Sequence, residues 1–559
     1  MKTEMTQIGL RGALAAVMGL TAGAAMAEGA FDKALALDPA GFTTVNVTLD
    51  GKPVSLRRYD AVYVGKPVAM AAEQPARRMG PGGSPSGART QVLADLLAYQ
   101  RLVVFVPETA TDTSAMILNV NNGGWFASEL TPGIEAGGAY RSDSDTDKAG
   151  AALAAGHVYV DVGSRGRGIV AADGTLPGKA PAAVVDAKAA IRWLRLNDAA
   201  LPGSAERIVI TGTSGGGGLS AVVAASGNSA DFLPDLAEIG AAGVAADGTS
   251  SLADDVFAVI AYCPITDLGN ADMAYEWLYQ GIRSADNTAQ QDWSDLAQAA
   301  SATLAAAYPA YLASLGLTQP DGTPLRAETM KAAIATEVVR EVERHVAGGG
   351  TVPAMGEMFQ ITLRMRGEEK QITLANDWVT VDSGKVTALD IDAFLRFVAA
   401  TSALKNVPAF DRTANTGNQG VDGENSLFGL PDQPYANFSA FGWDHNQVAG
   451  DGSGADDSGR DWAAWTAGDG AALLAQTRAI NPLSYLGTEA KAAPYWYVRH
   501  GMIDRDTAFA VEVTLANAAR MDGDVRSVDF RLPWMVPHSG NYDVQEAYGW
   551  LAGVLAAAN

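Results

Sequence analysis

Strand-like and helix-like segments alternate between residues 102 and 262, and this order restricts the possible fold more than any other feature of the chain. Residues 182–196 carry apolar side chains at the spacing of a helix. Short apolar runs with the composition of β-strands lie around this helix at 102–106, 116–120, 158–162, 207–211 and 256–262. Strands that alternate with helices form a mostly parallel sheet covered on both faces. The sequence therefore predicts an α/β fold.

The alternation stops near residue 270 and returns only close to the C-terminus. Residues 270–480 hold helical stretches at 329–345 and 391–404, together with glycine-rich loops, but no evident strand–helix alternation. Strand signals return at 495–499 and 525–532, and a helix is expected at 544–558.

This pattern predicts one core interrupted by a large insertion. The first part of the core would span residues 28–269, including an N-terminal hairpin that turns at Asp50-Gly51. The inserted lid domain would span 270–480, and the second part of the core 481–559.

The first 27 residues have the layout of a secretory signal peptide. Lys2 and Arg11 precede an apolar run of small residues, 12–24, which ends in the small-x-small sequence Ala25-Met26-Ala27. The apolar run is too short to span a bilayer. We therefore expect an exported protein, either periplasmic or secreted, whose mature chain begins near residue 28.

Charge and cysteine content exclude several classes of protein. The chain has 40 Lys and Arg against 63 Asp and Glu, a net charge of −23. Such an acidic surface repels phosphate backbones and anionic lipid, so neither nucleic acid nor a membrane is expected as a partner. Because Cys263 is the one cysteine, an intrachain disulfide and a cysteine-based zinc site are both excluded. The expected partner is a small molecule.

A serine occupies a glycine-rich turn between a predicted strand and a predicted helix. Residues 212–216 read Gly-Thr-Ser-Gly-Gly, a G-x-S-x-G motif centred on Ser214. In a nucleophile elbow, this turn exposes the serine hydroxyl at the edge of the sheet, and the helix behind it favours developing negative charge. The motif alone is weak in a chain with 61 glycines. The strand before it and the helix after it favour a nucleophile over a glycine-rich anion-binding turn.

Acyl transfer to serine also needs N–H donors for the oxyanion. The backbone N–H of Gly215 would be one donor. Residues 121–125, Asn-Asn-Gly-Gly-Trp, follow a predicted strand and stand where an HGGG-type loop is expected, so Gly123 and Gly124 are candidates for the second. The loop begins with Asn rather than His, and an ordinary turn is the alternative.

The base and acid follow from chain order, which in this type of hydrolase is Ser, then Asp or Glu, then His. His538 lies in a loop after the last predicted strand and is the best candidate for the base. Asp504 follows the preceding strand and is preferred as the acid, with Asp506 and Asp267 as alternatives. The other histidines in the permitted order are expected on the surface or in local packing: His345, His445 and His500.

Several segments together resemble the bacterial tannases (tannin acyl hydrolases) of the tannase and feruloyl esterase family. They run in order from about residue 120 to the C-terminus. Those around the predicted triad read Gly212-Thr-Ser-Gly-Gly-Gly-Gly-Leu-Ser220, Arg499-His-Gly-Met-Ile-Asp-Arg-Asp-Thr507 and Pro537-His-Ser-Gly-Asn-Tyr-Asp543. Others read Ala261-Tyr-Cys-Pro-Ile-Thr-Asp267, Leu404-Lys-Asn-Val-Pro-Ala-Phe-Asp411 and Glu424-Asn-Ser-Leu-Phe-Gly429.

The resemblance implies an α/β-hydrolase core with a large inserted lid, and hydrolysis of galloyl esters without a metal or organic cofactor. It implies Ser214 as nucleophile, Asp504 as acid and His538 as base. By position, Lys405, Glu424 and Asp506 match the family's contacts to the galloyl hydroxyls; a solvated Lys405–Glu424 ion pair is the simpler alternative.

Two departures from the family pattern are visible: Gly215 stands where alanine is expected, and the stretch between Lys405 and Glu424 is long. Three rival functions use the same features. They are a feruloyl or chlorogenate esterase, an exported serine peptidase, and a non-catalytic aromatic-binding protein on a hydrolase scaffold.

Overall fold

The computed structural model describes residues 28–75, 90–288, 293–365, 368–413, 423–447 and 453–558. The predicted signal peptide therefore lies outside the described residues. So does most of the long stretch between Lys405 and Glu424.

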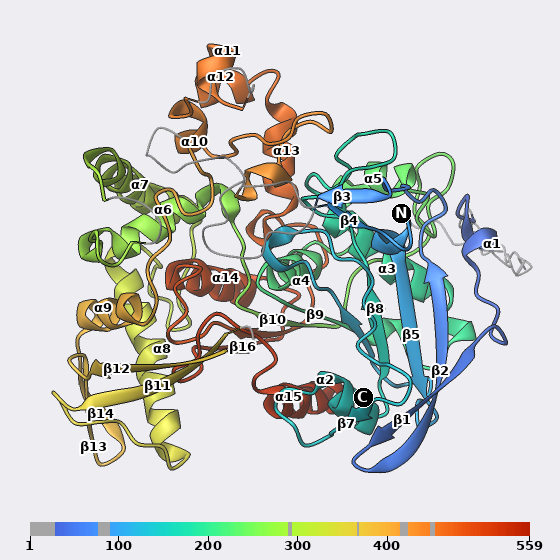
Figure 1. Ribbon diagram of the computed structural model, residues 1–559, viewed down its shortest axis with the longest axis horizontal. Helices are drawn as coiled ribbons and strands as arrows, with labels where there is room; N and C mark the ends of the chain where they lie inside the picture. The colour runs from blue at the N-terminus through green and yellow to red at the C-terminus, as the bar shows by residue number, and fades with distance from the viewer. Residues whose placement is uncertain are drawn as a thin grey trace, which may run out of the picture.

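A mostly parallel sheet forms the centre of the described chain (Figure 1). It has ten strands in the order β16-β15-β10-β9-β6-β8-β5-β2-β1-β7. The run from β16 to β8 is parallel, and β5, β2 and β1 continue it in antiparallel pairs. The strands of this sheet are β1 (Thr43–Leu49), β2 (Lys52–Val62), β5 (Arg101–Pro107), β6 (Met116–Asn119), β7 (Ala139–Tyr140), β8 (Val158–Val162), β9 (Ile208–Thr213), β10 (Ala258–Tyr262), β15 (Tyr495–Arg499) and β16 (Ser527–Arg531).

Alternate residues of each strand feed two cores, one on each face of the sheet. In β5, Leu102 and Val104 belong to the larger core, whereas Val103 and Phe105 belong to the smaller one. Helices α3 (Ala182–Leu196), α4 (Gly215–Ala225) and α14 (Phe509–Met521) cover the larger core, and α2 (Lys148–Ala154) and α15 (Val544–Ala557) cover the smaller one. Because both faces are covered, the central strands are apolar throughout, as their composition predicted.

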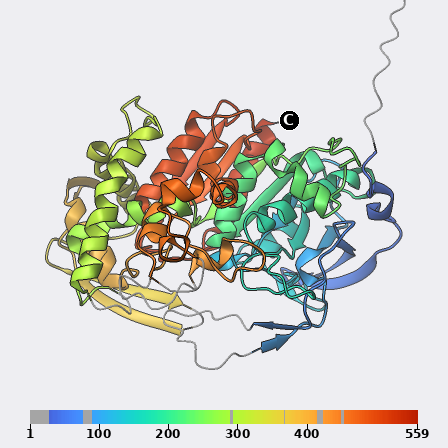
Figure 2. The same ribbon diagram turned by 90° about the horizontal axis from the view of Figure 1, so that it is seen from above.

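The chain leaves the sheet after β10 and returns with β15. In both views, this intervening segment lies on one side of the molecule, away from β1 and β2 (Figures 1 and 2). Its elements are α6 (Leu268–Tyr279), α7 (Asp295–Ser314), α8 (Ala327–Ala347), β11 (Met358–Met365), β12 (Glu368–Ala375), β13 (Val379–Asp382), β14 (Lys385–Leu389), α9 (Ile391–Thr401), α10 (Ala440–Asp444), α11 (Ala455–Ser458), α12 (Trp462–Thr466) and α13 (Ala471–Ala479). The remaining short elements are α1 (Asp32–Leu35), β3 (Glu73–Pro75), β4 (Thr90–Val92) and α5 (Leu233–Glu238).

The sequence interpretation of this segment missed its two hairpins, β11–β12 and β13–β14. A local signal was present, because Phe359, Ile361 and Leu363 are buried at alternate positions of β11. The predicted helices at 329–345 and 391–404 are confirmed as α8 and α9. The α/β prediction is confirmed, whereas the division at residues 270 and 480 stays a prediction.

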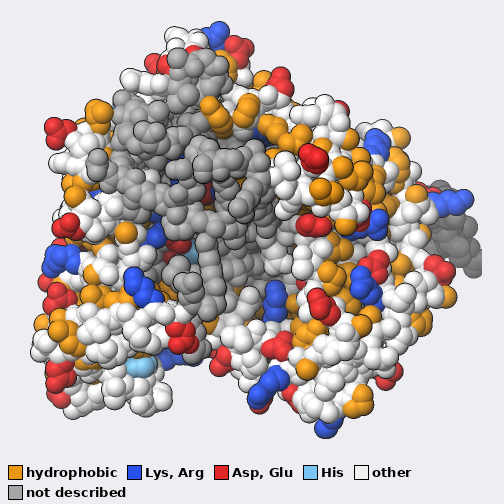
Figure 3. Space-filling view, viewed as in Figure 1, with side chains coloured by type: hydrophobic (Ala, Val, Ile, Leu, Met, Phe, Trp, Pro, Cys, Tyr) orange, Lys and Arg blue, Asp and Glu red, His pale blue; other side chains and the backbone are white. Residues whose placement is uncertain are grey.

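The surface agrees with a protein that is not built around one charged face. Figure 3 shows Lys and Arg side chains interspersed with Asp and Glu over the visible face. Among the described residues, no helix combines the length and apolar composition needed to cross a bilayer.

Candidate active site

Ser214 lies at the sharp turn between β9 and α4, where the G-x-S-x-G motif placed it. Its backbone has φ 62° and ψ −124°, a conformation that L-residues adopt at a cost of about 1–3 kcal/mol. A Cβ on Gly212 would lie 2.3 Å from the carbonyl oxygen of Gly216, so the turn closes only with glycine at that position. The sequence thus spends conformational strain to present one hydroxyl at the carboxyl end of β9.

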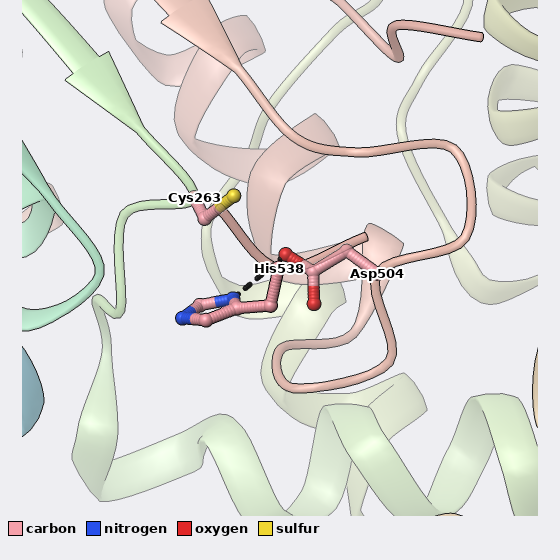
Figure 4. A group of neighbouring side chains, drawn as sticks. All are labelled: Cys263, Asp504 and His538. Atoms are coloured by element: carbon pink, nitrogen blue, oxygen red, sulfur yellow. Dashed lines mark hydrogen bonds and ion pairs between the residues drawn. The ribbon is translucent and has the colours of Figure 1, made fainter. Parts of the chain in front are cut away.

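His538 connects Ser214 with Asp504. It lies in the loop between β16 and α15, and its Nε2 is 2.8 Å from Ser214 Oγ. Its Nδ1 is 2.8 Å from Asp504 Oδ2, the contact drawn in Figure 4. Three loops, which follow β9, β15 and β16, therefore converge at the carboxyl edge of the sheet. The structure brings together the three side chains that the sequence proposed as a triad.

Asp504 is completely buried and carries a stabilised negative charge. Its Oδ1 accepts a hydrogen bond from the Asp506 N–H at 2.8 Å. Burial by itself raises the pKa of Asp504, but the imidazoles of His538 and His500 and the hydrogen bonds to the carboxylate hold that pKa below its ordinary value. Burial lowers the pKa of His538, and the Asp504 carboxylate more than offsets this effect, so the pKa of His538 is raised. This pairing favours proton uptake by the imidazole.

The two alternative acids are less well placed. Asp506 Oδ2 is 3.9 Å from His538 Nδ1, beyond hydrogen-bond distance. The Asp267 carboxylate instead accepts hydrogen bonds from Tyr311 Oη and from the side-chain amides of Asn270 and Asn481. Asp504 is therefore the acid that the geometry favours.

The loop after β6 packs directly against the residue after Ser214. A Cβ built on Gly215 would lie 2.8 Å from the backbone nitrogen of Gly124. The Gly123 N–H donates to the Asn121 carbonyl at 2.9 Å, and the Trp125 N–H donates to the Asn122 carbonyl at 2.8 Å. Of the two predicted loop donors, Gly124 is thus better placed than Gly123 to act with Gly215 on an oxyanion.

The three predicted substrate contacts gather near His538, but not as the simple ion pair considered from sequence. Lys405 Nζ lies 4.0 Å from the centroid of the Phe410 ring. Burial lowers the pKa of Lys405, while the charges of Glu424 and Asp506 act in the opposite direction. Glu424 is buried and pairs with Arg167 at 3.6 Å.

Comparison with known proteins follows from this geometry. A tannin acyl hydrolase solved with 3,4-dihydroxybenzoate is 30% identical, covers 93% of this chain and 99% of its own, and superposes with a TM-score of 0.71. The chain belongs to the tannin acyl hydrolase family. This assignment confirms the resemblance seen in the sequence, the α/β-hydrolase fold and the class of enzyme, a carboxylic ester hydrolase.

Other tannases agree with this family assignment. The *Lactobacillus plantarum* tannin acyl hydrolase is 30% identical, with 93% of this chain and 99% of that chain covered and a TM-score of 0.69. The *Fusobacterium nucleatum* tannase is 28% identical at the same coverages, with a TM-score of 0.70. The BD-FAE family model matches residues 102–311, and no curated protein matches the chain.

Arg167 is a site residue that the sequence interpretation missed in this tannase-family chain. Its Nε donates to the Gly124 carbonyl at 2.6 Å, and its Nη1 donates to the Gly423 carbonyl. The guanidinium also stacks 3.9 Å from the Phe126 ring centroid. Arg167 thus ties the loop that carries Gly124 to the segment that carries Glu424, a link that no local motif indicates.

Cys263 lies beside the triad but has a structural contact of its own. Its Sγ donates to the Ser539 carbonyl at 3.0 Å, and burial raises the pKa of the thiol well above its usual range. One potential ligand atom each from Cys263, Asp504 and His538 lies within 4.8 Å of the others (Figure 4). Because the imidazole and the carboxylate already bind each other, we assign no metal to this group.

Proposed function

We propose that this protein is a serine esterase that hydrolyses galloyl esters of tannins and simple gallates. Ser214 is the nucleophile, His538 the general base and Asp504 the acid that orients the imidazole. The observation that carries the proposal is the unbroken line from Ser214 Oγ through His538 to Asp504, with 2.8 Å at each step. A serine hydroxyl is a weak nucleophile until such a base takes its proton.

The proposed reaction proceeds through an acyl-enzyme. His538 Nε2 takes the proton from Ser214 Oγ as the oxygen attacks the ester carbonyl, and the N–H groups of Gly215 and Gly124 stabilise the oxyanion. The protonated imidazole then gives its proton to the leaving alcohol. Water, activated by the same imidazole, hydrolyses the galloyl-Ser214 ester and releases gallate. Each proton is returned, so the cycle requires neither metal nor organic cofactor.

Ring recognition is proposed for Lys405, Glu424 and Asp506. A galloyl ring carries three adjacent hydroxyls, which can donate to carboxylates and accept from an ammonium group. Solved tannases hold 3,4-dihydroxybenzoate in one case and ethyl gallate in another, and both molecules carry adjacent ring hydroxyls. We propose that the acidic pair and Lys405 read such hydroxyls in this chain.

A hydroxycinnamate ester such as ferulate is the second candidate substrate, favoured by the BD-FAE match over residues 102–311. Ferulate offers one free ring hydroxyl, so part of the Lys405, Glu424 and Asp506 set would lose its partner. Polar groups left unpaired in a closed site can reduce kcat/KM by several orders of magnitude. The two substrates therefore separate the two functions.

The test compares kcat/KM for methyl gallate, methyl ferulate and methyl benzoate. We expect a preference of about 10²-fold or more for methyl gallate over methyl ferulate. Glu424→Gln should lower kcat/KM for methyl gallate by about tenfold or more, with a smaller effect on methyl benzoate, because benzoate offers no hydroxyl to Glu424. A preference of the wild type for methyl ferulate would overturn the galloyl assignment and leave the esterase assignment in place.

Export is proposed from residues 1–27 alone. If these residues are a cleaved signal peptide, protein recovered from outside the cytoplasm should begin at Glu28, after the Ala25-Met26-Ala27 sequence. N-terminal sequencing of the fractionated protein measures this directly. Active, uncleaved protein confined to the cytoplasm would contradict it.

A further inference from the structure

A second buried histidine lies behind the proposed triad. His500 directly follows β15, and Glu512 lies in the second turn of α14; both side chains are fully buried. His500 Nδ1 is 3.5 Å from Asp504 Oδ2 and 3.6 Å from Glu512 Oε1. Asp504 Oδ2 therefore faces two imidazoles, since His538 Nδ1 is 2.8 Å from the same oxygen.

This pair is conspicuous because its polar atoms have no hydrogen-bond partner of normal length. Within the described part of the chain, this holds for both ring nitrogens of His500 and for both carboxyl oxygens of Glu512. An unsatisfied buried polar group costs about 1–3 kcal/mol, so four such atoms in one place require an explanation. Packing alone would be served better by apolar side chains.

The charges in this cluster are ordered by burial. Burial raises the pKa of Glu512 well above its usual range, and the charge of Asp504 acts in the same direction. Burial lowers the pKa of His500, although Asp504 opposes this. Both groups are thus uncharged at neutral pH, while Asp504 is ionised. The titratable and charged groups around His500 and Asp504 are His538, Glu512, Asp506, Arg505, Cys263 and Tyr279.

We propose that His500 and Glu512 extend the line Ser214–His538–Asp504 inward: His500 donates its Nδ1–H to Asp504 Oδ2 in competition with His538, and uncharged Glu512 flanks the same N–H. Both are positioning residues, because they reach the substrate only through Asp504 and His538. The inference rests on the proposed triad. A small movement would bring the 3.5 Å separation to normal hydrogen-bond length.

The competition sets how tightly His538 holds its proton. With two donors on one oxygen, Asp504 attracts the His538 proton less strongly than it would alone. Removing the His500 donor leaves Asp504 to His538 alone and raises the pKa of His538. Since catalysis needs an unprotonated His538, the acidic limb of kcat/KM then moves to higher pH.

The experiment compares His500→Leu with His500→Asn. Leucine has no donor, whereas the side-chain amide of asparagine can place an N–H near the position of Nδ1. For His500→Leu we expect the acidic limb of kcat/KM to rise by about 0.5–1 pH unit, which lowers kcat/KM at low pH by about three- to tenfold. His500→Asn should return the limb to the wild-type position. An unmoved limb in His500→Leu, or equal shifts in both variants, would overturn the proposal.

Two further measurements keep the proposal falsifiable if His500→Leu does not fold. Glu512→Gln, which keeps the shape and the absence of charge, should leave the limb in place; a shift to lower pH would mean that Glu512 is an anion and would overturn the proposal. Proton NMR of the wild type should show two downfield imidazole N–H signals, one of which disappears in His500→Asn. A single signal would contradict the second donor.

A fluorophosphonate probe separates this inference from the function on which it rests. If the probe does not label Ser214 in the wild type, the proposed function fails, and the inference fails with it. If Ser214 is labelled and the acidic limb does not move, the inference alone fails.

Discussion

Replacing Ser214 with alanine is expected to lower kcat/KM for methyl gallate by about 10⁴-fold or more, because no other group can form the acyl-enzyme. The residual rate would come from binding and from the oxyanion donors alone. The Ser214 hydroxyl contributes a single hydrogen bond to His538, so the fold should survive its loss. The measurement is gallate release, with thermal unfolding recorded on the same preparation.

Ser220 offers a matched control in the same helix. Its Oγ donates to the Gly216 carbonyl at 2.8 Å and makes no contact with His538 among the described residues. Ser220→Ala should cost about 1 kcal/mol of stability and retain activity within a few-fold. A fluorophosphonate should label the wild type and Ser220→Ala but not Ser214→Ala. A Ser214→Ala variant that keeps most of its activity would exclude Ser214 as the nucleophile.

The triad geometry could be predicted because each member follows a strand of a parallel sheet. The carboxyl ends of such strands meet at one edge, so residues after β9, β15 and β16 had to approach each other even though they are far apart in sequence. Chain order then selected His538 over the other histidines. Asp504 and Asp506 differ by only two positions, and it took the structure to separate them, at 2.8 Å and 3.9 Å from His538 Nδ1.

The supporting residues could not be found in the same way. Arg167 acts across the interface between the core and the segment around Glu424, and its role depends on where two distant loops meet. His500 was expected to pack locally, and only the three-dimensional position of α14 brings Glu512 and the triad acid to the same ring nitrogen. Local patterns specify which element a residue occupies, but contacts between elements depend on how those elements pack.

Gly215 is the departure from the family pattern that the structure explains. A Cβ at this position would lie 2.2 Å from the Trp125 nitrogen and 2.4 Å from the Asn122 carbonyl oxygen. Both are backbone atoms of the loop that carries Gly124, so they cannot rotate away as a side chain could. Glycine here lets this loop approach Ser214 more closely than alanine would allow.

Gly215→Ala is therefore expected to displace the loop and move the Gly124 N–H away from the oxyanion. Losing one oxyanion donor lowers kcat by about 10²–10³-fold. KM should change little, because the ring contacts at Lys405, Glu424 and Asp506 lie elsewhere. Steady-state kinetics with methyl gallate measures both parameters, and the fluorophosphonate probe counts the molecules in which Ser214 is still reactive.

Gly553→Ala is the control for the effect of alanine in a helix. Gly553 lies in α15, and a Cβ there would meet nothing within 4 Å. Alanine should stabilise that helix by up to about 1 kcal/mol and leave kcat unchanged. If Gly215→Ala matches it in kcat, the loop either does not move or does not supply the second donor, and the assignment of Gly124 is wrong. If kcat falls while Ser214 remains reactive and the protein remains folded, the close approach of the two backbones is what stabilises the oxyanion.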